Sequence, residues 1–260
     1  MKGKLKFVTM GILVLSLIFA IGCGGEKPAT TNEGNEVASY KVGTDAAYAP
    51  FESISPSGEI EGFDIDVMKA IAAAEGFEVE FVNTAWEGIF SSLNGKNDLI
   101  ISAVTITDDR KKEMDFSEPY FESTNYIAVP QDSEITSLED LKGKIVSVQE
   151  GTTGDEALTE FLGKDYKDIK RFKGTPEAFL ELRNDKAAAA VADSGVVGNY
   201  VKNNPEANLK IIKDDGFPKE FYGVAVTKGN TELLEKINSG LQKIKDNGEY
   251  DRVYSKWFSE

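Results

Sequence analysis

An alternation of strand-like and helix-like segments between residues 40 and 110 restricts the possible folds more than any other feature of the sequence. The strand-like segments are residues 40–44, 78–82 and 98–101. The two segments between them, 63–76 and 86–93, carry apolar residues at helical spacing. This βαβαβ order predicts a parallel sheet whose strands are connected by helices.

A second strand-and-helix series follows an extended segment near residues 120–126. It includes a strand over 144–148, helices that begin near Asp155 and Thr175, and a small-residue strand over 187–192. A second extended segment near 217–223 precedes a strand that ends near 226 and two final helices, 231–246 and 250–258.

Two such series joined by two extended crossings predict an α/β fold with two lobes, a ligand cleft between them and hinges at the crossings. We expect residues 37–121 together with 223–260 to form lobe 1. Residues 122–222 are expected to form lobe 2, with hinge strands at its ends.

Composition excludes several classes of partner and of chemistry. The chain has 44 Asp and Glu residues against 29 Lys and Arg, and its net charge of −15 disfavours nucleic acid and anionic membrane surfaces. It has no histidine and a single cysteine, Cys23. These counts exclude histidine-dependent catalytic triads, an internal disulfide and a thiolate metal cluster, so no cofactor or metal is expected.

The first 36 residues predict export and a tether. Residues 1–22 combine lysines with an apolar run shorter than the roughly 20 residues that span a bilayer, which is typical of a signal peptide. Small residues before Cys23 resemble the lipobox of bacterial lipoproteins, whose cysteine is lipidated and anchors the protein to the outer face of the cell membrane. The alternative is an ordinary signal with an incidental cysteine. Residues 24–36 hold no large apolar side chain and predict a solvated tether.

The segment 98–110 carries the first sign of a binding site. Its apolar strand turns polar at Ser102 and Thr105 and ends at Arg110. Ligands of open α/β sheets bind at the carboxyl edge of the strands, where an arginine can bind a small carboxylate through two parallel hydrogen bonds. The alternative is a surface arginine paired with Asp108 or Glu113.

Several separated motifs together resemble the solute-binding proteins of polar amino-acid ABC importers, solute-binding family 3, of the arginine- and glutamine-binding type. They are VGTDAAYAPFE (42–52), GFDIDV (62–67), SAVTITDDRKKEMDFSEPY (102–120), SLEDLKGKIVSVQEGTTG (137–154), ADSG (192–195) and GEYDRVYSKWF (248–258). The resemblance covers residues 37–260. It implies two lobes that close over one amino acid, a permease as partner, a monomer, and no enzymatic activity.

The resemblance also implies which residues bind the two charges that every free amino acid carries. Arg110 matches the arginine that binds the α-carboxylate, and backbone N–H groups or hydroxyls of Thr105 and Thr153 would assist it. The turn that contains Thr152 opens a helix, whose N-terminus favours an anion. An ordinary turn and N-cap is the alternative interpretation of this turn.

Asp193 matches the carboxylate that binds the α-ammonium, opposite the carbonyl or side chain of Ser102 or Ala103. Without the resemblance, Asp193 is also a good N-cap for the next helix, and the two roles are compatible. Ala103 stands where many relatives have glycine or serine, which would narrow the floor of the pocket.

At the side-chain end, Tyr48 and Trp86 match an aromatic pair that encloses the ligand side chain, and Asp45 matches the acid that meets its polar end. On spacing alone Trp86 is a core residue and Asp45 a turn residue.

Asp45 and Glu52 between aromatic faces favour a planar cation. Lysine at the position of Gln149 and histidine at that of Ala192 would be expected in glutamine-binding members, and this chain has neither. Gln149 and Glu150 are expected to add acceptors in place of that positive charge. We therefore expect arginine as the ligand, with lysine or histidine weaker and glutamine as the alternative.

Two other classes of function remain open at this point. Some relatives act as dehydratases, which would require a general acid such as Glu52 or Glu150 over the cleft. A sensor subunit would report the ligand to a receptor instead of a permease.

Overall fold

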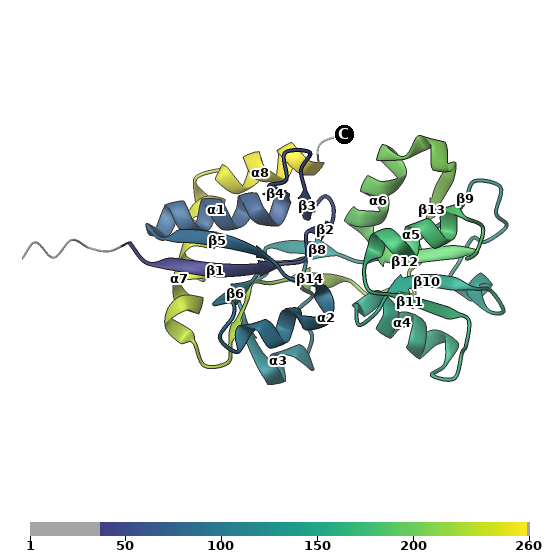
Figure 1. Ribbon diagram of the computed structural model, residues 1–260, viewed down its shortest axis with the longest axis horizontal. Helices are drawn as coiled ribbons and strands as arrows, with labels where there is room; N and C mark the ends of the chain where they lie inside the picture. Colours follow the sequence, from purple (N-terminus) through teal and green to yellow (C-terminus); the bar gives the residue numbers. More distant parts are fainter. Residues whose placement is uncertain (1–36, 259–260) are drawn as a thin grey trace, which may run out of the picture. The chain divides into compact units, whose positions relative to one another are not determined.

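The computed structural model describes residues 37–258, which form one compact unit (Figure 1). The predicted signal peptide, Cys23 and the tether lie outside the described residues.

Lobe 1 is built on a five-stranded sheet with the strand order β5-β1-β6-β15-β7. Strand β1 pairs in parallel with its neighbours β5 and β6, as the sequence predicts, whereas β15 returns from the second crossing and pairs antiparallel with β6 and β7. The strands are β1 (Ser39–Thr44), β5 (Glu78–Asn83), β6 (Leu99–Ile100), β7 (Met114–Phe116) and β15 (Ala225–Thr227).

The helices of lobe 1 follow the apolar spacing of the sequence. The predicted helix over 63–76 is α1 (Phe63–Glu75), which buries Phe63, Val67 and Ile71 completely and ends at Gly76 in a left-handed conformation. The remaining helices are α2 (Trp86–Ile89), continued as a 3₁₀ turn over Phe90–Leu93, α3 (Arg110–Glu113), α7 (Thr231–Asp246) and α8 (Glu249–Phe258).

Lobe 2 has a second five-stranded sheet with the order β11-β10-β12-β9-β13, flanked by three helices. Strands β10, β11 and β12 are parallel, while β9 runs antiparallel to β12 and β13. The elements are β9 (Asn125–Pro130), β10 (Val146–Gln149), β11 (Ile169–Phe172), β12 (Ala189–Asp193), β13 (Leu209–Ile212), α4 (Thr153–Leu162), α5 (Thr175–Arg183) and α6 (Ser194–Asn203).

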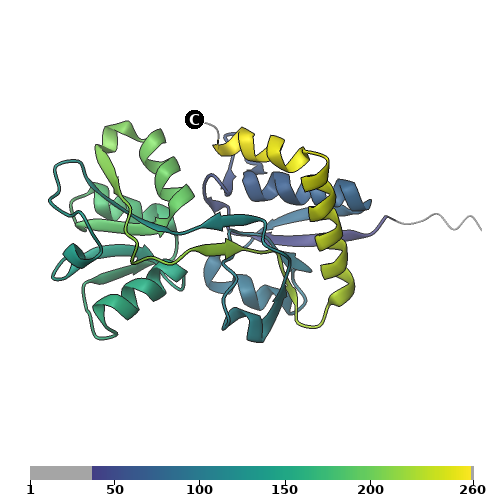
Figure 2. The ribbon, with the colours of Figure 1, turned by 180° about the vertical axis from the view of Figure 1, so that it is seen from behind.

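The two crossings lie side by side as β8 (Phe121–Ser123) and β14 (Glu220–Tyr222), which form an antiparallel pair (Figure 2). The predicted two-lobed α/β architecture with two hinge strands is therefore confirmed. The residue limits of the lobes stay a prediction.

The segment between β1 and α1 contains a small three-stranded sheet that the sequence pattern does not predict. It consists of β2 (Ala47–Tyr48), β3 (Glu52–Ile54) and β4 (Ile60–Glu61). Its strands are short and pair only locally, which explains why period-2 patterning is too weak to reveal them.

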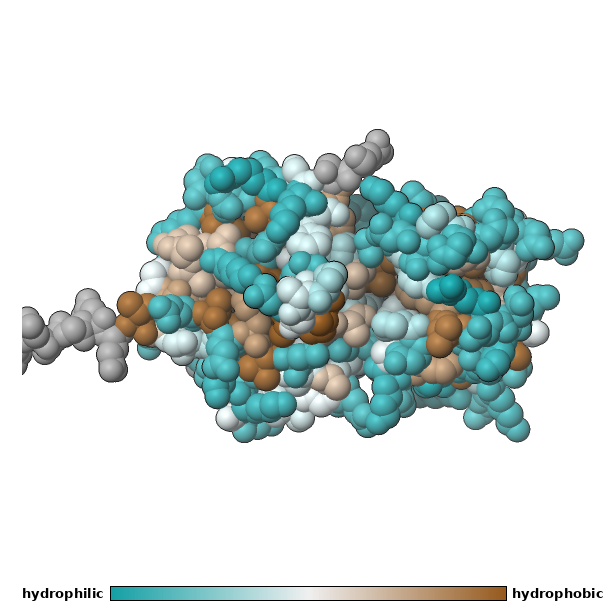
Figure 3. Space-filling model, turned by 45° about the horizontal axis from the view of Figure 1, so that its top comes forward, coloured by the Kyte–Doolittle hydropathy of each residue, from teal (hydrophilic) through white to brown (hydrophobic). Residues whose placement is uncertain are grey.

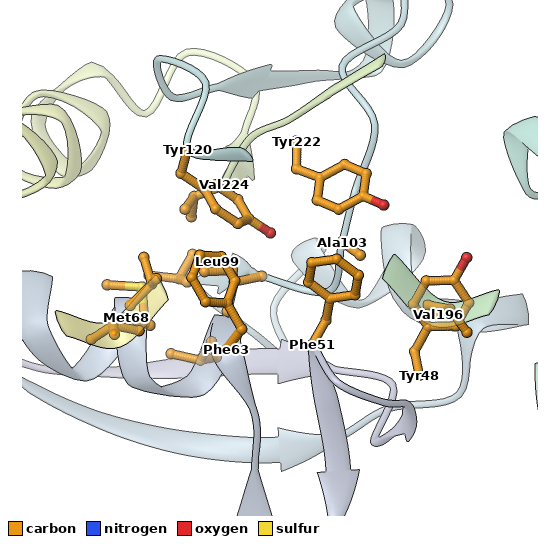
Figure 4. Close-up of a cluster of buried hydrophobic side chains, with 14 of the residues drawn as sticks. Tyr48, Phe51, Phe63, Met68, Leu99, Ala103, Tyr120, Val196, Tyr222 and Val224 are labelled. Carbon is orange, nitrogen blue, oxygen red and sulfur yellow. The ribbon is translucent and has the colours of Figure 1, made fainter. Parts of the chain in front are cut away.

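An aromatic cluster fills the space beside the hinge strands. The Phe51 ring lies 6.1 Å from Phe63, 5.0 Å from Phe121 and 5.2 Å from Tyr222, centroid to centroid (Figure 4). Phe51 and Tyr222 are fully buried. This packing ties the loop between β1 and α1 to both crossings, and so it holds Tyr48 and Glu52 next to the hinge.

The face of the molecule drawn in Figure 3 is mainly hydrophilic, with smaller apolar areas between the polar ones. Within residues 37–258, helices long and apolar enough to cross a membrane are absent.

Candidate functional site

A pocket with about 320 Å³ of empty space, part of it open to solvent, lies between the carboxyl ends of the two sheets. All eleven ligand-binding residues expected from the sequence line it, together with Glu52: Asp45, Tyr48, Trp86, Ser102, Ala103, Thr105, Arg110, Gln149, Thr152, Thr153 and Asp193.

Arg110, the first residue of α3, points its guanidinium at the boundary between the lobes. Its NH1 group donates to the Thr105 carbonyl at 2.9 Å and NH2 to the Gly151 carbonyl at 3.4 Å. The guanidinium carbon also lies 5.4 Å from the Trp86 ring centroid. The alternative partner Asp108 instead pairs with Lys111, at 3.9 Å. Arg110 therefore keeps further N–H donors for an anion in the pocket.

The hydroxyls of Thr105 and Thr153 have a partner that the sequence analysis missed. Both donate to Glu220 Oε2, at 2.9 and 2.8 Å, and Asn125 Nδ2 donates to Glu220 Oε1 at 3.0 Å. Each hydroxyl has one hydrogen and donates it to Glu220, so the hydroxyls are not available to donate to a ligand carboxylate. Of the two expected kinds of donor, the backbone N–H groups of these threonines are therefore favoured over the hydroxyls. Glu220 is the single acid within the predicted crossing 217–223, and that was the available signal for it.

The turn over 151–154 is both an N-cap and a wall of the pocket. The Thr152 hydroxyl accepts from the Asp155 N–H at 3.3 Å and donates to the Gln149 carbonyl at 2.9 Å, which caps α4. The N-cap interpretation is thus correct. Because the turn also lines the pocket, the free N–H groups and positive dipole end of α4 are directed at this region.

Asp193 stands at the end of β12 and is 4% exposed. Its Oδ2 accepts a short hydrogen bond from the Tyr222 hydroxyl. Burial raises the pKa of Asp193 to about 7, and the neighbouring charge of Glu220 adds to the rise, while the hydroxyls of Tyr222 and Tyr48 oppose it. Within residues 37–258 its side chain makes no capping hydrogen bond to α6, although it occupies the N-cap position, so the site role of Asp193 does not compete with a cap.

Asp45, which also lines the pocket, receives donors from both lobes. Its Oδ2 accepts from the Trp86 N–H at 3.3 Å and from Gln149 Nε2 at 3.2 Å. Burial raises the pKa of Asp45, and the hydrogen bond from Gln149 partly offsets that rise. Asp45 is therefore a structured acid of the pocket and not only a turn residue.

Gln149 was expected to add hydrogen-bond acceptors to the pocket, but it presents donors there. Its Oε1 accepts from the Thr175 hydroxyl at 2.7 Å, so its amide presents N–H groups to Asp45 and to the Lys173 carbonyl. Glu150 is exposed and is not among the residues that line the pocket. Gln149 orients Asp45, and Asp45 remains the acceptor in this part of the pocket.

Trp86 packs at the edge of the core and also lines the pocket, while its contact with a ligand side chain stays a prediction. Its ring packs against Phe90 with centroids 5.1 Å apart, at the edge of a core cluster. The indole Nε1 donates to the Gly151 carbonyl of the other lobe at 3.3 Å. A surface ion pair between Lys173 and Glu87, 2.7 Å apart, also connects the lobes.

Ser102 and Ala103 form the floor of the pocket. The Ser102 hydroxyl donates to Glu52 Oε1 at 2.8 Å and accepts from the Asp45 N–H at 3.0 Å. Ala103 has a φ of +46°, a left-handed conformation that costs a residue with a Cβ about 1 kcal/mol. Its methyl group at this position agrees with the expected narrowing of the floor.

Among the described residues, clusters of three or more groups that could hold a metal ion are absent.

Comparison with known proteins agrees with this architecture. Residues 40–260 match the family model described as bacterial extracellular solute-binding proteins, family 3. The chain belongs to this family.

A "Probable histidine-binding protein" of Neisseria gonorrhoeae is 41% identical over 251 residues, which covers 95% of this chain and 94% of that protein. Among solved structures, the arginine-, lysine-, histidine-binding protein ArtJ of Geobacillus stearothermophilus is 42% identical, with a TM-score of 0.82 over 85% of this chain and 96% of its own. An ancestral arginine-binding protein bound to arginine is 45% identical, with a TM-score of 0.80 over 85% of this chain and 99% of its own.

Proposed function

We propose that this family member is a non-catalytic, extracytoplasmic binding protein that captures a polar or basic L-amino acid and delivers it to an ABC importer. The observation that carries the proposal is the placement of Arg110 and Asp193 in one pocket between the lobes. A free amino acid is a zwitterion, and burying either charge without a partner is prohibitive. A pocket that offers one fixed cation and one fixed anion satisfies both.

The carboxylate of the ligand would lie against Arg110, the N-terminus of α4 and the backbone N–H groups of Thr105 and Thr153. The ammonium group would lie against Asp193, whose raised pKa reflects a buried acid close to the Glu220 carboxylate. A cation beside Asp193 favours its ionised form.

We propose arginine as the preferred ligand, with lysine or histidine weaker. Asp45 is held as an acceptor by Trp86 and Gln149, so that it suits the guanidinium group of the ligand side chain. The names of the relatives include arginine, lysine and histidine binders, which supports a basic ligand. A glutamine binder of the same family is the alternative.

The partner and location follow from the same proposal. The loaded protein would deliver its ligand to the transmembrane subunits of an ABC permease, act as a monomer, and be held at the outer face of the cell membrane by lipid on Cys23.

A dehydratase on this scaffold receives less support from the site. Glu150 lies outside the pocket lining, and Glu52 is fully buried with one oxygen accepting from Ser102. A general acid must reach the atom that it protonates, and Glu150 lies outside the pocket, while Glu52 lines the pocket with one oxygen already engaged by Ser102.

A thermal unfolding panel of the purified protein with the twenty amino acids tests the proposal. A ligand present at 100 times its Kd should stabilise the folded protein by about 2.7 kcal/mol, because only the folded form binds. Arginine should give the largest shift. Absence of a shift with all basic and amide amino acids would refute the proposed function. Turnover of a cyclic dienyl acid by the purified protein would instead show that the protein is a dehydratase.

A further inference from the structure

Two buried carboxyl groups at the pocket floor, Glu52 in the lining and Asp64 outside it, are not explained by the ligand contacts described above. Glu52 and Asp64 are both fully buried. With both groups treated as carboxylates, Glu52 Oε2 and Asp64 Oδ1 have no hydrogen-bond partner within residues 37–258. An unsatisfied buried carboxylate oxygen is costly, and two of them side by side would also repel each other.

The remaining oxygens of the pair are well satisfied, and by donors of different kinds. Asp64 Oδ2 accepts from the Ala103 N–H at 2.6 Å and from the Tyr120 hydroxyl at 2.7 Å, and Tyr120 lies across from Phe63 in the aromatic cluster (Figure 4). Glu52 Oε1 accepts from the Ser102 hydroxyl at 2.8 Å. Two strong donors on Asp64 favour negative charge there, and so a proton belongs on Glu52.

We propose that Glu52 and Asp64 share one proton, placed between Glu52 Oε2 and Asp64 Oδ1, and that this carboxyl pair positions the Ser102–Ala103 floor for the ammonium group of the ligand. The one proton gives both otherwise unsatisfied oxygens a partner. The role of the floor rests on the proposed function, whereas the shared proton does not.

The electrostatics of the two groups agree with this assignment. Burial, followed by the charge of Asp64, raises the pKa of Glu52 well above its usual range. Burial also raises the pKa of Asp64 to about 7, and the hydrogen bonds from Ala103 and Tyr120 oppose the rise. The proton therefore stays on Glu52 when Asp64 ionises.

The pair determines which way the Ser102 hydroxyl points. That hydroxyl has one hydrogen, and Glu52 Oε1 accepts it. Ser102 Oγ therefore presents only lone pairs, one of which accepts from the Asp45 N–H at 3.0 Å. Since Ser102 lines the pocket, the other lone pair is available to a ligand N–H group. Glu52 is thus a positioning residue that makes Ser102 an acceptor, and Asp64 holds the left-handed turn at Ala103 in place.

Infrared spectroscopy of the purified protein at about pH 8 tests the shared proton directly. The carbonyl stretch of a protonated carboxylic acid should be present in the wild type and absent from Glu52→Gln. If the wild-type spectrum lacks this band, both groups are ionised and the proposal is overturned. This result is independent of ligand binding, so it remains decisive if the amino-acid panel shows no ligand at all.

Rescue by the conservative variant tests the positioning role. Glu52→Met removes the acceptor for Ser102 and should weaken ligand binding by about 10-fold or more, as measured by calorimetry. Glu52→Gln should recover most of that loss, because its amide oxygen can accept from Ser102 and its N–H can donate to Asp64. Circular dichroism and thermal unfolding establish that each variant is folded. Equal losses for Met and Gln would overturn the role.

A double-mutant cycle shows whether Glu52 acts through Ser102. In the Ser102→Ala background, Glu52→Met should cost much less affinity than in the wild type, because the hydroxyl that it orients is absent. Additive losses would contradict the positioning role.

Discussion

Two parts of the pocket lining, Arg110 with Asp193 and Asp45 with Gln149, are held in place in different ways. Beside Arg110 and Asp193, the hinge strand β14 contributes Tyr222, which donates to Asp193, and Glu220, which accepts from the hydroxyls of Thr105 and Thr153. Asp45 is held by a longer hydrogen bond of 3.2 Å from Gln149 of the other lobe. In the proposed function, the first group would bind the two charges that all amino acids share, and Asp45 would bind the part of the side chain that distinguishes them.

The largest expected effect is the loss of binding in Arg110→Ala. Removing one partner of a desolvated charge pair costs at least about 2–5 kcal/mol, or roughly 30-fold to several thousand-fold in Kd. Calorimetry should show this loss for every amino acid that the wild type binds. Arg183→Ala, at a surface ion pair with Glu206 outside the pocket, is the matched control and should bind normally. If Arg110→Ala weakened the binding of basic amino acids only, Arg110 would contact the ligand side chain and not the α-carboxylate that all amino acids share.

A pH profile of ligand affinity probes the same part of the pocket through Asp193. Because the pKa of Asp193 is raised to about 7, its protonated form dominates below that pH and must lose a proton before it can accept an ammonium group. Affinity should be full above about pH 7 and fall by up to about tenfold per pH unit below it. Asp193→Asn should bind weakly and lose this slope. A flat wild-type profile between about pH 5 and 8 would contradict the assignment.

In the other part of the pocket, Asp45→Asn should change which ligand is preferred. A hydrogen bond to a charged group contributes about 1.5–3 kcal/mol, so arginine should lose about 10-fold or more in affinity while glutamine loses less. The ratio of the two Kd values is the quantity to measure. Gln149→Lys is the companion variant: a lysine beside Asp45 would compensate its charge and should lower the preference for arginine in the same direction. An equal loss for both ligands would show that Asp45 supports affinity and not specificity.

The smallest effect is expected outside both parts, at the ion pair between Lys173 and Glu87. The two side chains are 81% and 69% exposed, so that solvent and salt screen the pair and its contribution to binding is small. Lys173→Ala should therefore change ligand affinity by less than about fivefold, and the change should shrink further at high salt. A larger loss would identify this pair as a significant contact between the closed lobes.

Local patterns of the sequence predict many of the helices and strands correctly. The helix over Phe63–Glu75 follows from apolar spacing and from Gly76. Strands β11 and β13 were missed because each is short and takes its place in the sheet from neighbours far away in sequence. The same reason explains the antiparallel return of β15 beside β6, which only the second crossing makes possible.

The sequence by itself determined which residue types are present for the site: one arginine after a strand, an acid after another strand, and an acid and two aromatics in separate motifs. Only the tertiary structure decided how their hydrogen bonds are distributed. Thr105 and Thr153 donate to Glu220, Gln149 donates to Asp45, and Asp64 lies under Ala103. Each of these pairs joins segments 39 or more residues apart. Such contacts depend on the closure of the fold, because the burial that makes each partner necessary arises only when the segments meet.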